Sequence, residues 1–439
     1  MNNIHIRNGS VLLPGGLKNV DLEISEGVIS DIGAPRGTSP AETIDARGKF
    51  VLPGFIDIHT NGIAGFDFTN GRYDLTSDSF ASDEENYLDA TEAASRAFLR
   101  TGVTRAVLSS VAAPPDQLMK VFRLFDQYKS QQTGTPWKDV LWGINIEGSF
   151  IKSAAYRGAH NPAYFLEPSV ELYEDLQNAS GRRVRIVNVA PEWGDSALRL
   201  IEHASAGHVV CAAGHTGATG DQYNEAIRRG TRLAVHFLNG PSLSSGKSLN
   251  SGGAIESALR AESFYVEIIV DGYHVDKSYV LDIIRRKGFD RTIAITDSMF
   301  ATALTGLKKF TFLGVQGVVS QDGRYLQIAG REDSLFGSVL TMDRAFSKIL
   351  TWLTMPIEGV WTASHPPLEF EDALLKTWQL CSRNPAILLG IYSPNQGGAP
   401  GTGSIELGKC ADIVVAQIER VRDTFALKVD RVIANGSLL

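Results

Sequence analysis

The chain has few cysteines and no long apolar run, and both shortages limit what it can be. Only Cys211, Cys381 and Cys410 occur among 439 residues, and no C-x-x-C pair exists, which argues against a disulfide scaffold or a zinc ribbon. No apolar run approaches the roughly 20 residues of a membrane span, so no membrane partner is expected. The N-terminal residues lack the charged start and apolar core of a signal peptide, which predicts a cytoplasmic location.

An excess of basic residues is also missing. The chain has 42 Lys and Arg against 49 Asp and Glu, a formal net charge of -7. Nucleic-acid binders usually carry a basic excess, so we expect no nucleic-acid partner. The 43% hydrophobic and 21% charged residues are typical of a globular protein. With so few cysteines, any metal ion must be bound by His, Asp and Glu, and the nine histidines are the residues to place.

The centre of the chain contains eight short apolar runs, each followed by a helical-looking stretch. Continuous apolar runs are typical of parallel strands buried on both faces, and alternation with helices predicts right-handed βαβ units. Eight units over roughly 340 residues predict an α/β fold, a (β/α)8 TIM-like barrel, with a doubly wound open sheet as the alternative. The predicted strands are Phe55–Ile58, Val103–Leu108, Val140–Ile146, Val184–Val189, Val209–Ala213, Arg232–Val235, Phe264–Val270 and Thr292–Ile295.

Both ends of the chain consist of short predicted strands separated by turn residues. We therefore expect a discontinuous β-sandwich domain from residues 1–52 and 391–439, and a barrel domain from residues 53–390. The predicted terminal strands are Ile4–Ile6, Val11–Leu13, Asp21–Ile24, Val28–Ile32, Gly403–Leu407, Asp412–Ala416, Ala426–Val429 and Arg431–Ile433.

Polar residues follow the predicted barrel strands at their carboxyl ends, where a (β/α)8 barrel builds its active site. Glu147, His215 and His236 offer one carboxylate and two imidazoles from three strands, a set that suits a divalent ion such as zinc. Asp297, after the eighth strand, is placed to accept a proton from an activated water. The residues at these strand ends are His59, Asn61, Glu147, His215, His236, Asp271, His274 and Asp297.

Seven motifs lie along the chain in a distinctive order: PGFIDIHTNG (53–62), NIEGSF (145–150), GAHNP (158–162), AGHTGAT (213–219), HFLNG (236–240), DGYHVD (271–276) and ITDSM (295–299). This ordered set resembles that of the N-acetylglucosamine-6-phosphate deacetylases of the amidohydrolase superfamily. The C-terminal GSIELGKCADIVV (403–415) is similar to the superfamily's returning β-sandwich segment. The resemblance runs from about residue 45 to the end of the chain.

The resemblance implies a homodimeric, metal-dependent hydrolase of C–N bonds that converts N-acetylglucosamine 6-phosphate to glucosamine 6-phosphate and acetate. Glu147, His215 and His236 match the family's metal ligands, and Asp297 matches its catalytic acid/base. His274 matches a residue that contacts the sugar and helps to polarise the amide carbonyl. The implied substrate-binding residues are Ala159, His160, Asn239, Gly240, Lys247, Asp271, His274, Leu335, Phe336 and Gly337.

The first-strand motif departs from the family form that supports two metal ions. It has His59 and Asn61 where the two-ion form has two histidines, and this difference favours one ion per subunit. His59 and Asn61 are the residues of a possible second metal site. Zinc is the expected ion, with iron, manganese, cobalt and nickel as alternatives.

The expected phosphate contact also departs from the family pattern. Lys247 stands where the family typically places an arginine that reaches across the dimer to the sugar phosphate. Arginine binds phosphate bidentately whereas lysine is a point charge, so the substrate pocket is expected to differ. The alternatives are an amidohydrolase acting on another C–N bond (an N-acyl amino acid, a cyclic amide or another N-acetylhexosamine) or a non-catalytic sugar-binding or scaffold protein.

Overall fold

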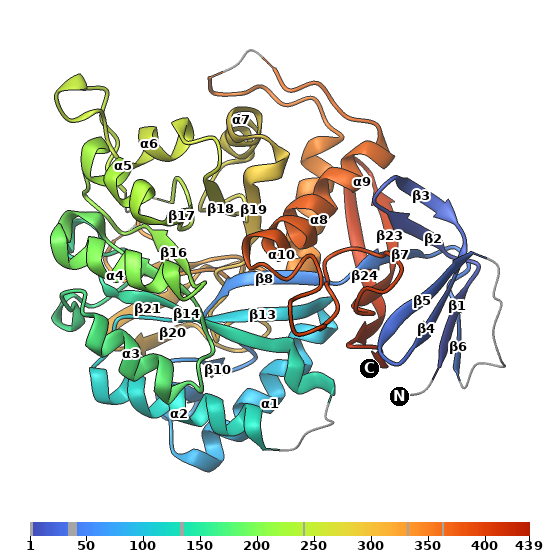
Figure 1. Cartoon of the computed structure of the whole chain (residues 1–439), viewed down its shortest axis with the longest axis horizontal. Helices are drawn as coiled ribbons and strands as arrows, with labels where there is room; N and C mark the ends of the chain where they lie inside the picture. Colours follow the sequence, from blue (N-terminus) through green and yellow to red (C-terminus); the bar gives the residue numbers. More distant parts are fainter. Residues whose placement is uncertain (1–2, 34–41, 132–135, 240–241, 332, 362–363) are drawn as a thin grey trace.

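A sheet of eight parallel strands lies at the centre of the molecule (Figure 1). The structure is a computed structural model that describes residues 3–33, 42–131, 136–239, 242–331, 333–361 and 364–439. Each strand of the sheet pairs with the next one along the chain, as successive βαβ units require. The strands are β8 (Phe55–Thr60), β13 (Val103–Ser110), β14 (Leu141–Phe150), β15 (Val184–Val189), β16 (Val210–Ala213), β17 (Thr231–Ala234), β18 (Tyr265–Ile269) and β19 (Thr292–Ile295).

Hydrogen bonds between the first and last strands close this sheet into a barrel. The Thr296 hydroxyl donates to Asp57 Oδ2 at 2.5 Å, and the Asp297 amide donates to the His59 carbonyl at 2.9 Å. Alternate residues such as Ile56 and Ile58 fill the interior, because successive side chains of a strand point to opposite faces. The predicted barrel is confirmed, and the open-sheet alternative is wrong.

Helices cover the outside of the barrel (Figure 1). α5 begins with a capping box, in which the Thr219 hydroxyl accepts from the Gln222 amide at 3.3 Å and Gln222 Oε1 accepts from the Thr219 amide at 3.0 Å. Among the described residues, no helix is long and apolar enough to cross a bilayer. The helices are α1 (Glu84–Arg100), α2 (Pro115–Ser130), α3 (Val170–Ala179), α4 (Asp195–Ala206), α5 (Gly220–Arg229), α6 (Ala254–Arg260), α7 (Lys277–Lys287), α8 (Met342–Leu353), α9 (Phe370–Trp378) and α10 (Asn384–Leu388).

Two small antiparallel sheets are inserted after the first and the last barrel strand. The first insert contains β9 (Gly62–Ile63), β10 (Phe66–Asp67), β11 (Gly71–Asp74) and β12 (Ser79–Ala81). The second contains β20 (Lys309–Phe312), β21 (Val315–Val319) and β22 (Leu326–Ile328). Because both inserts follow the carboxyl ends of barrel strands, they lie at the end of the barrel where the predicted site residues gather.

The two ends of the chain meet in a pair of sheets beside the barrel (Figure 1). β7 joins the ends, because it pairs with β2 in parallel and with β23 in antiparallel. One apolar core contains Ile4 and Ile24 from the N-terminal segment and Ile413 and Ile433 from the C-terminal one. The strands are β1 (Ile4–Arg7), β2 (Ser10–Leu13), β3 (Gly16–Asn19), β4 (Asp21–Ser25), β5 (Val28–Gly33), β6 (Glu42–Asp45), β7 (Phe50–Pro53), β23 (Ile413–Val421), β24 (Thr424–Ala434) and β25 (Ser437–Leu438).

Two of the predicted terminal strands differ from the structure. Gly403–Leu407 forms no strand, because Gly403 has a left-handed φ of 88° and the segment only inserts Ile405 into the terminal core. Ala426–Val429 and Arg431–Ile433 belong to one strand, β24. The break predicted between them is a register shift against β23, a β-bulge. The domain boundaries at residues 52/53 and 390/391 stay a prediction.

A buried ion pair joins the barrel to the terminal sheets. Arg105 of β13 donates to Asp412, with Nη2 3.0 Å from Oδ2, and their side chains are 9% and 1% exposed. Removing one member of a buried pair leaves an uncompensated charge. We therefore expect Asp412→Asn to lower the free energy of unfolding by about 3 kcal/mol or more, measured by urea denaturation.

The matched control is Asp430→Asn. Asp430 pairs with Lys49 at 2.7 Å, but its side chain is 37% exposed, so we expect a loss below about 1 kcal/mol. Equal losses for the two variants would show that the Arg105–Asp412 pair does not stabilise the junction.

Candidate active site

Seven of the predicted site residues lie near or just beyond the carboxyl ends of barrel strands. Glu147 is within β14, whereas four residues each stand two positions past the end of their strand: His215, His236, Asp271 and Asp297. His59 is the fifth residue of β8, and Asn61 directly follows that strand. Because parallel strands end at one rim of the barrel, side chains far apart in sequence meet there.

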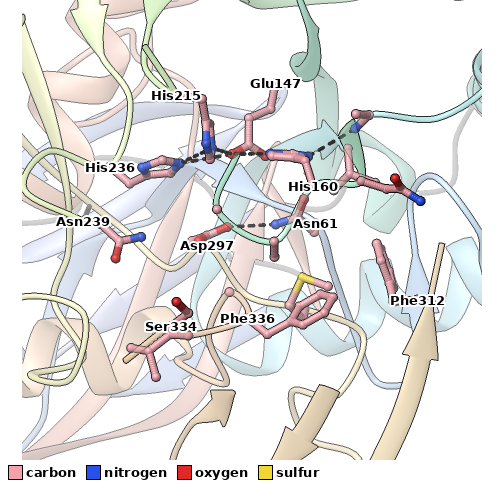
Figure 2. A pocket seen from close by; sticks show the side chains of 18 of the residues that line it. Asn61, Glu147, His160, His215, His236, Asn239, Asp297, Phe312, Ser334 and Phe336 are labelled. Atoms are coloured by element: carbon pink, nitrogen blue, oxygen red, sulfur yellow. Dashed lines mark hydrogen bonds and ion pairs between the residues drawn. The ribbon is translucent and has the colours of Figure 1, made fainter. Parts of the chain in front are cut away.

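Glu147, His215 and His236 form a tight, buried cluster (Figure 2). Glu147 Oε1 lies 3.3 Å from His215 Nε2 and 3.1 Å from His236 Nε2, and the two imidazole nitrogens are 3.0 Å apart. Burial alone would raise the pKa of Glu147, but the charge of His59 and the hydrogen bonds from neighbouring histidines hold it well below its usual range. The carboxylate is therefore ionised.

This cluster fits a divalent metal ion. Ligand atoms bound to one ion at about 2.0–2.2 Å in a tetrahedron lie about 3.3–3.6 Å apart, close to the separations in the cluster. His215 Nδ1 lies 2.9 Å from the Tyr156 carbonyl, so it carries the proton and Nε2 presents a lone pair. Burial lowers the pKa of His236 to about 3, which keeps its ring neutral, as a metal ligand requires.

A second group of potential ligands shares Glu147 and His236 with the first and adds His59. His59 Nε2 lies 3.2 Å from Glu147 Oε2, and its Nδ1 lies 3.0 Å from Glu267 Oε2. Glu267, fully buried on β18, therefore orients the His59 ring. Sequence reasoning missed Glu267, although a glutamate inside the apolar run Phe264–Val270 is itself a signal of a buried partner.

Asp297 lies beside this cluster and is bonded to Asn61. Asn61 Nδ2 donates to Asp297 Oδ1 at 2.8 Å, and Asn61 Oδ1, the atom that could bind a metal ion, is buried without a hydrogen-bond partner among the described residues. Burial raises the pKa of Asp297 to about 6, against the lowering effect of the His59 charge. A carboxyl group poised near neutrality can both accept and donate a proton, as general acid/base catalysis requires.

Three residues of the site have left-handed backbone conformations. The φ angles are 50° at His215, 26° at His236 and 49° at Asp297. Residues other than glycine rarely adopt positive φ, and such residues gather at active sites because the surrounding structure holds them there. The local fold therefore turns these side chains toward one point at a cost in backbone strain.

A pocket of about 310 Å³ opens onto the cluster. In Figure 2 the histidines and Glu147 lie on one side, and Phe312 and Phe336 on the other. Pockets of a few hundred Å³ that join an apolar wall to a few polar groups suit small-molecule ligands. The predicted residues that line this pocket are Asn61, Glu147, Ala159, His160, His215, His236, Asn239, Asp297, Leu335, Phe336 and Gly337.

Several lining residues come from the insert after β19 and were not predicted. Phe312 is the last residue of β20 and Leu313 follows it, and Arg331 and Ser334 lie on the segment after β22. The sequence FTFLGVQGVV has the alternating apolar residues and the turn that are typical of a hairpin. It gives no indication that this hairpin folds back over the barrel.

Four predicted residues among those that the structure describes do not line the pocket: His59, Lys247, Asp271 and His274. Asp271 Oδ2 lies 2.6 Å from His274 Nδ1, and both side chains are buried outside the lining, although the His274 charge still acts on Asp297. Lys247 is exposed and is not among the described residues that line the pocket. Gly240 lies outside the described residues.

The chain is similar in sequence to known proteins over most of its length. The amidohydrolase family model matches residues 50–439. The N-acetylglucosamine-6-phosphate deacetylase of Vibrio furnissii is 30% identical over 388 residues, covering 88% of this chain and 84% of that relative. The N-acetylgalactosamine-6-phosphate deacetylase of Escherichia coli O157:H7 is 28% identical, covering 80% of this chain and 85% of that relative.

The fold is similar to solved structures over its whole length. A mutant N-acetyl-D-glucosamine-6-phosphate deacetylase from Mycobacterium smegmatis, solved in complex with N-acetyl-D-glucosamine-6-phosphate, gives a TM-score of 0.78 at 26% identity. The match covers 100% of this chain and 99% of that one. The similarity therefore includes the terminal sheets as well as the barrel.

Proposed function

Because the chain belongs to the amidohydrolase family, among the N-acetylglucosamine-6-phosphate deacetylases, we propose that it hydrolyses N-acetylglucosamine 6-phosphate to glucosamine 6-phosphate and acetate. It is a hydrolase of carbon–nitrogen bonds. The observation that carries the proposal is the meeting of Glu147, His215 and His236 beside Asp297 in one pocket.

Glu147, His215 and His236 are the residues that would hold a divalent metal ion, with zinc as the proposed ion and one ion per subunit. Iron, manganese, cobalt and nickel ions could be bound by the same donor atoms. His59 forms a second group of potential ligands with Glu147 and His236. Such an ion supplies Lewis acidity, which lowers the pKa of water to about 7 and polarises a carbonyl oxygen.

Asp297 is the proposed acid/base. Its carboxylate accepts the proton of the water that attacks the amide carbon, and it returns that proton to the nitrogen as the C–N bond breaks. Asn61 holds the carboxylate through Oδ1 and leaves Oδ2 for the proton transfer. His274 is proposed to stabilise the oxygen of the substrate's amide carbonyl through a hydrogen bond from Nε2. Asp271 orients the ring at Nδ1, and the buried Nε2 has no partner among the described residues.

The sugar is proposed to lie between the polar cluster and the apolar wall of the pocket. Ala159, His160, Asn239 and residues 335–337 line it, which supports a role in binding. Gly240, Lys247 and Asp271 stay predictions as substrate contacts. A homodimer, in which Lys247 reaches a neighbouring subunit's pocket, and a cytoplasmic location also stay predictions.

The second candidate substrate is N-acetylgalactosamine 6-phosphate, because the Escherichia coli relative bears that name and matches over most of its length. The two sugars differ in the orientation of one ring hydroxyl group. A site that hydrogen-bonds this hydroxyl in one orientation can discriminate strongly between the two sugars.

A side-by-side assay tests the proposal. We expect metal-loaded enzyme to release acetate from N-acetylglucosamine 6-phosphate with a kcat/KM at least about 100-fold above that for unphosphorylated N-acetylglucosamine, because a charged contact to phosphate adds binding energy. N-acetylgalactosamine 6-phosphate and an N-acyl amino acid complete the panel. Faster turnover of the N-acyl amino acid would contradict the proposed function.

A further inference from the structure

The strand β15 lies between the two strands that carry Glu147 and His215 toward the site. Glu147 is on β14, and His215 stands two positions past the end of β16. Among the residues that the structure describes, β15 itself supplies neither a potential metal ligand nor a part of the pocket lining. A strand in this position can set the spacing of the two ligands without contacting the ion or the substrate.

The backbone ladder between β14 and β15 is interrupted beside Glu147. Consecutive pairs skip from Ile146 to Phe150 on β14, while they advance by only two residues on β15. Such a bulge leaves backbone groups without their partners in the ladder. The Asn188 side chain supplies one of the missing contacts, because its Nδ2 donates to the Glu147 carbonyl at 2.8 Å.

The same side chain also binds the segment that leads to His215. Asn188 Oδ1 accepts from the Gly214 amide at 2.8 Å, one residue before His215. Asn188 is fully buried, and it faces the barrel interior because Ile186, two residues earlier on the strand, belongs to the inner core. One side-chain amide therefore connects the backbone at Glu147 with the backbone next to His215.

This connection matters because the backbone of His215 is strained. Its φ of 50° is left-handed, a conformation that a residue other than glycine keeps only where its surroundings hold it. Asn188 holds the residue before it, and Glu192 holds the two residues after it. Glu192 Oε1 accepts from the Gly217 amide at 2.8 Å, and its Oε2 accepts from the Thr216 hydroxyl. The strained turn is thus fixed from both sides.

We propose that Asn188 is a positioning residue of the metal site, which sets Glu147 and His215 at the separation that one ion requires. Glu147 Oε1 and His215 Nε2 lie 3.3 Å apart, close to the separation of about 3.3–3.6 Å between two ligand atoms of one tetrahedral ion. The Asn188 amide bonds backbone groups, so it acts through the main chain of the two ligands. The proposal rests on the metal site of the proposed function and not on the identity of the substrate.

Metal binding by Asn188→Ala tests this role without substrate. We expect the Kd of the metal-free protein for Zn²⁺, measured by competition with a chelating dye, to rise about 10- to 100-fold, because residues that orient ligands contribute about this much to metal affinity. With Co²⁺ as the probe, the visible absorption spectrum should differ from that of wild type, because it reports the geometry of the bound ion.

Asn188→Thr is the conservative variant. Threonine suits a strand, and its hydroxyl group can keep one of the two hydrogen bonds of Asn188. We expect its Kd for Zn²⁺ to lie between those of wild type and Asn188→Ala. This variant carries the test if Asn188→Ala does not fold.

The matched control is Asn384→Ala. Asn384 is also fully buried, and its Nδ2 donates to the carbonyls of Phe289 at 2.6 Å and Thr292 at 2.8 Å, at the opposite end of the barrel. We expect Asn188→Ala and Asn384→Ala both to lower the thermal midpoint of the metal-free protein, because each loses two buried hydrogen bonds. Only Asn188→Ala should bind metal more weakly.

Two results would overturn the assignment. The first is the same Kd for Zn²⁺ in wild type, Asn188→Ala and Asn188→Thr. The second is an equal rise in Kd in Asn384→Ala, because the effect would then be one of general stability.

Two further measurements separate this proposal from the proposed function. If His215→Ala loses the metal ion while Asn188→Ala binds it as wild type does, the metal site stands and the positioning role is wrong. If the Kd values differ as expected but wild type releases no acetate from N-acetylglucosamine 6-phosphate, the proposed reaction is wrong and the positioning role stands.

Discussion

Asp297→Asn is expected to lower kcat by about 10³-fold while bound metal and fold stay unchanged. An asparagine keeps the size of the side chain, and its Oδ1 can still accept from Asn61. Asparagine also tolerates the left-handed backbone at this position, where φ is 49°. The substitution therefore removes the proton transfer alone. Acetate release, metal content and the thermal midpoint of unfolding are the three measurements.

The control for this experiment is Asn61→Ala. It removes the hydrogen bond to the Asp297 carboxylate but leaves the carboxylate itself, so we expect a smaller loss of kcat, about tenfold. An Asp297→Asn enzyme with near-normal turnover would show that another group accepts the proton.

His215→Ala is expected to abolish activity by removing the metal ion. The substitution takes one of three converging donors and leaves Glu147 and His236, which cannot complete a tetrahedral site. After dialysis, bound metal should fall from about one ion per chain to below about 0.1, as measured by elemental analysis. Activity should fall with the metal content and should not return at micromolar added metal.

His203→Ala is the matched control for loss of a histidine. His203 lies on α4, pairs with Glu174 at 2.7 Å and has a side chain that is 43% exposed. We expect it to keep both metal and activity. If His215→Ala also retained stoichiometric metal, His215 would not be a ligand, and the group of His59, Glu147 and His236 would become the candidate site.

The barrel and the centre of the site could be predicted from the sequence because both depend on local patterns. A parallel strand buried on both faces is a continuous apolar run, and a residue just past its end lies at the rim whatever the loops do. His215, His236 and Asp297 follow this rule, whereas Glu147 lies within β14, which continues past the predicted strand end at Ile146. The strand predicted at Gly403–Leu407 was wrong because a local pattern of alternating residues does not reveal that Gly403 has a left-handed conformation.

The far wall of the pocket could not be predicted because it depends on tertiary packing. Phe312 reaches the pocket only because β20 to β22 fold over the end of the barrel, and Arg331 does so only through the turn that follows β22. Neither residue stands at a fixed distance from a barrel strand. Lys247 was selected by resemblance, and its place outside the lining depends on a loop whose path the motif does not specify.

The position of β7 between β2 and β23 has a consequence for synthesis of the chain on the ribosome. Val51 pairs with both Val11 and Val415, so the N-terminal strands complete their sheet only after more than 360 further residues have been made. Contacts of such sequence separation slow folding and leave strand edges open meanwhile. We expect the nascent N-terminal strands to need protection from aggregation until the barrel has folded, and the terminal sheets to form last.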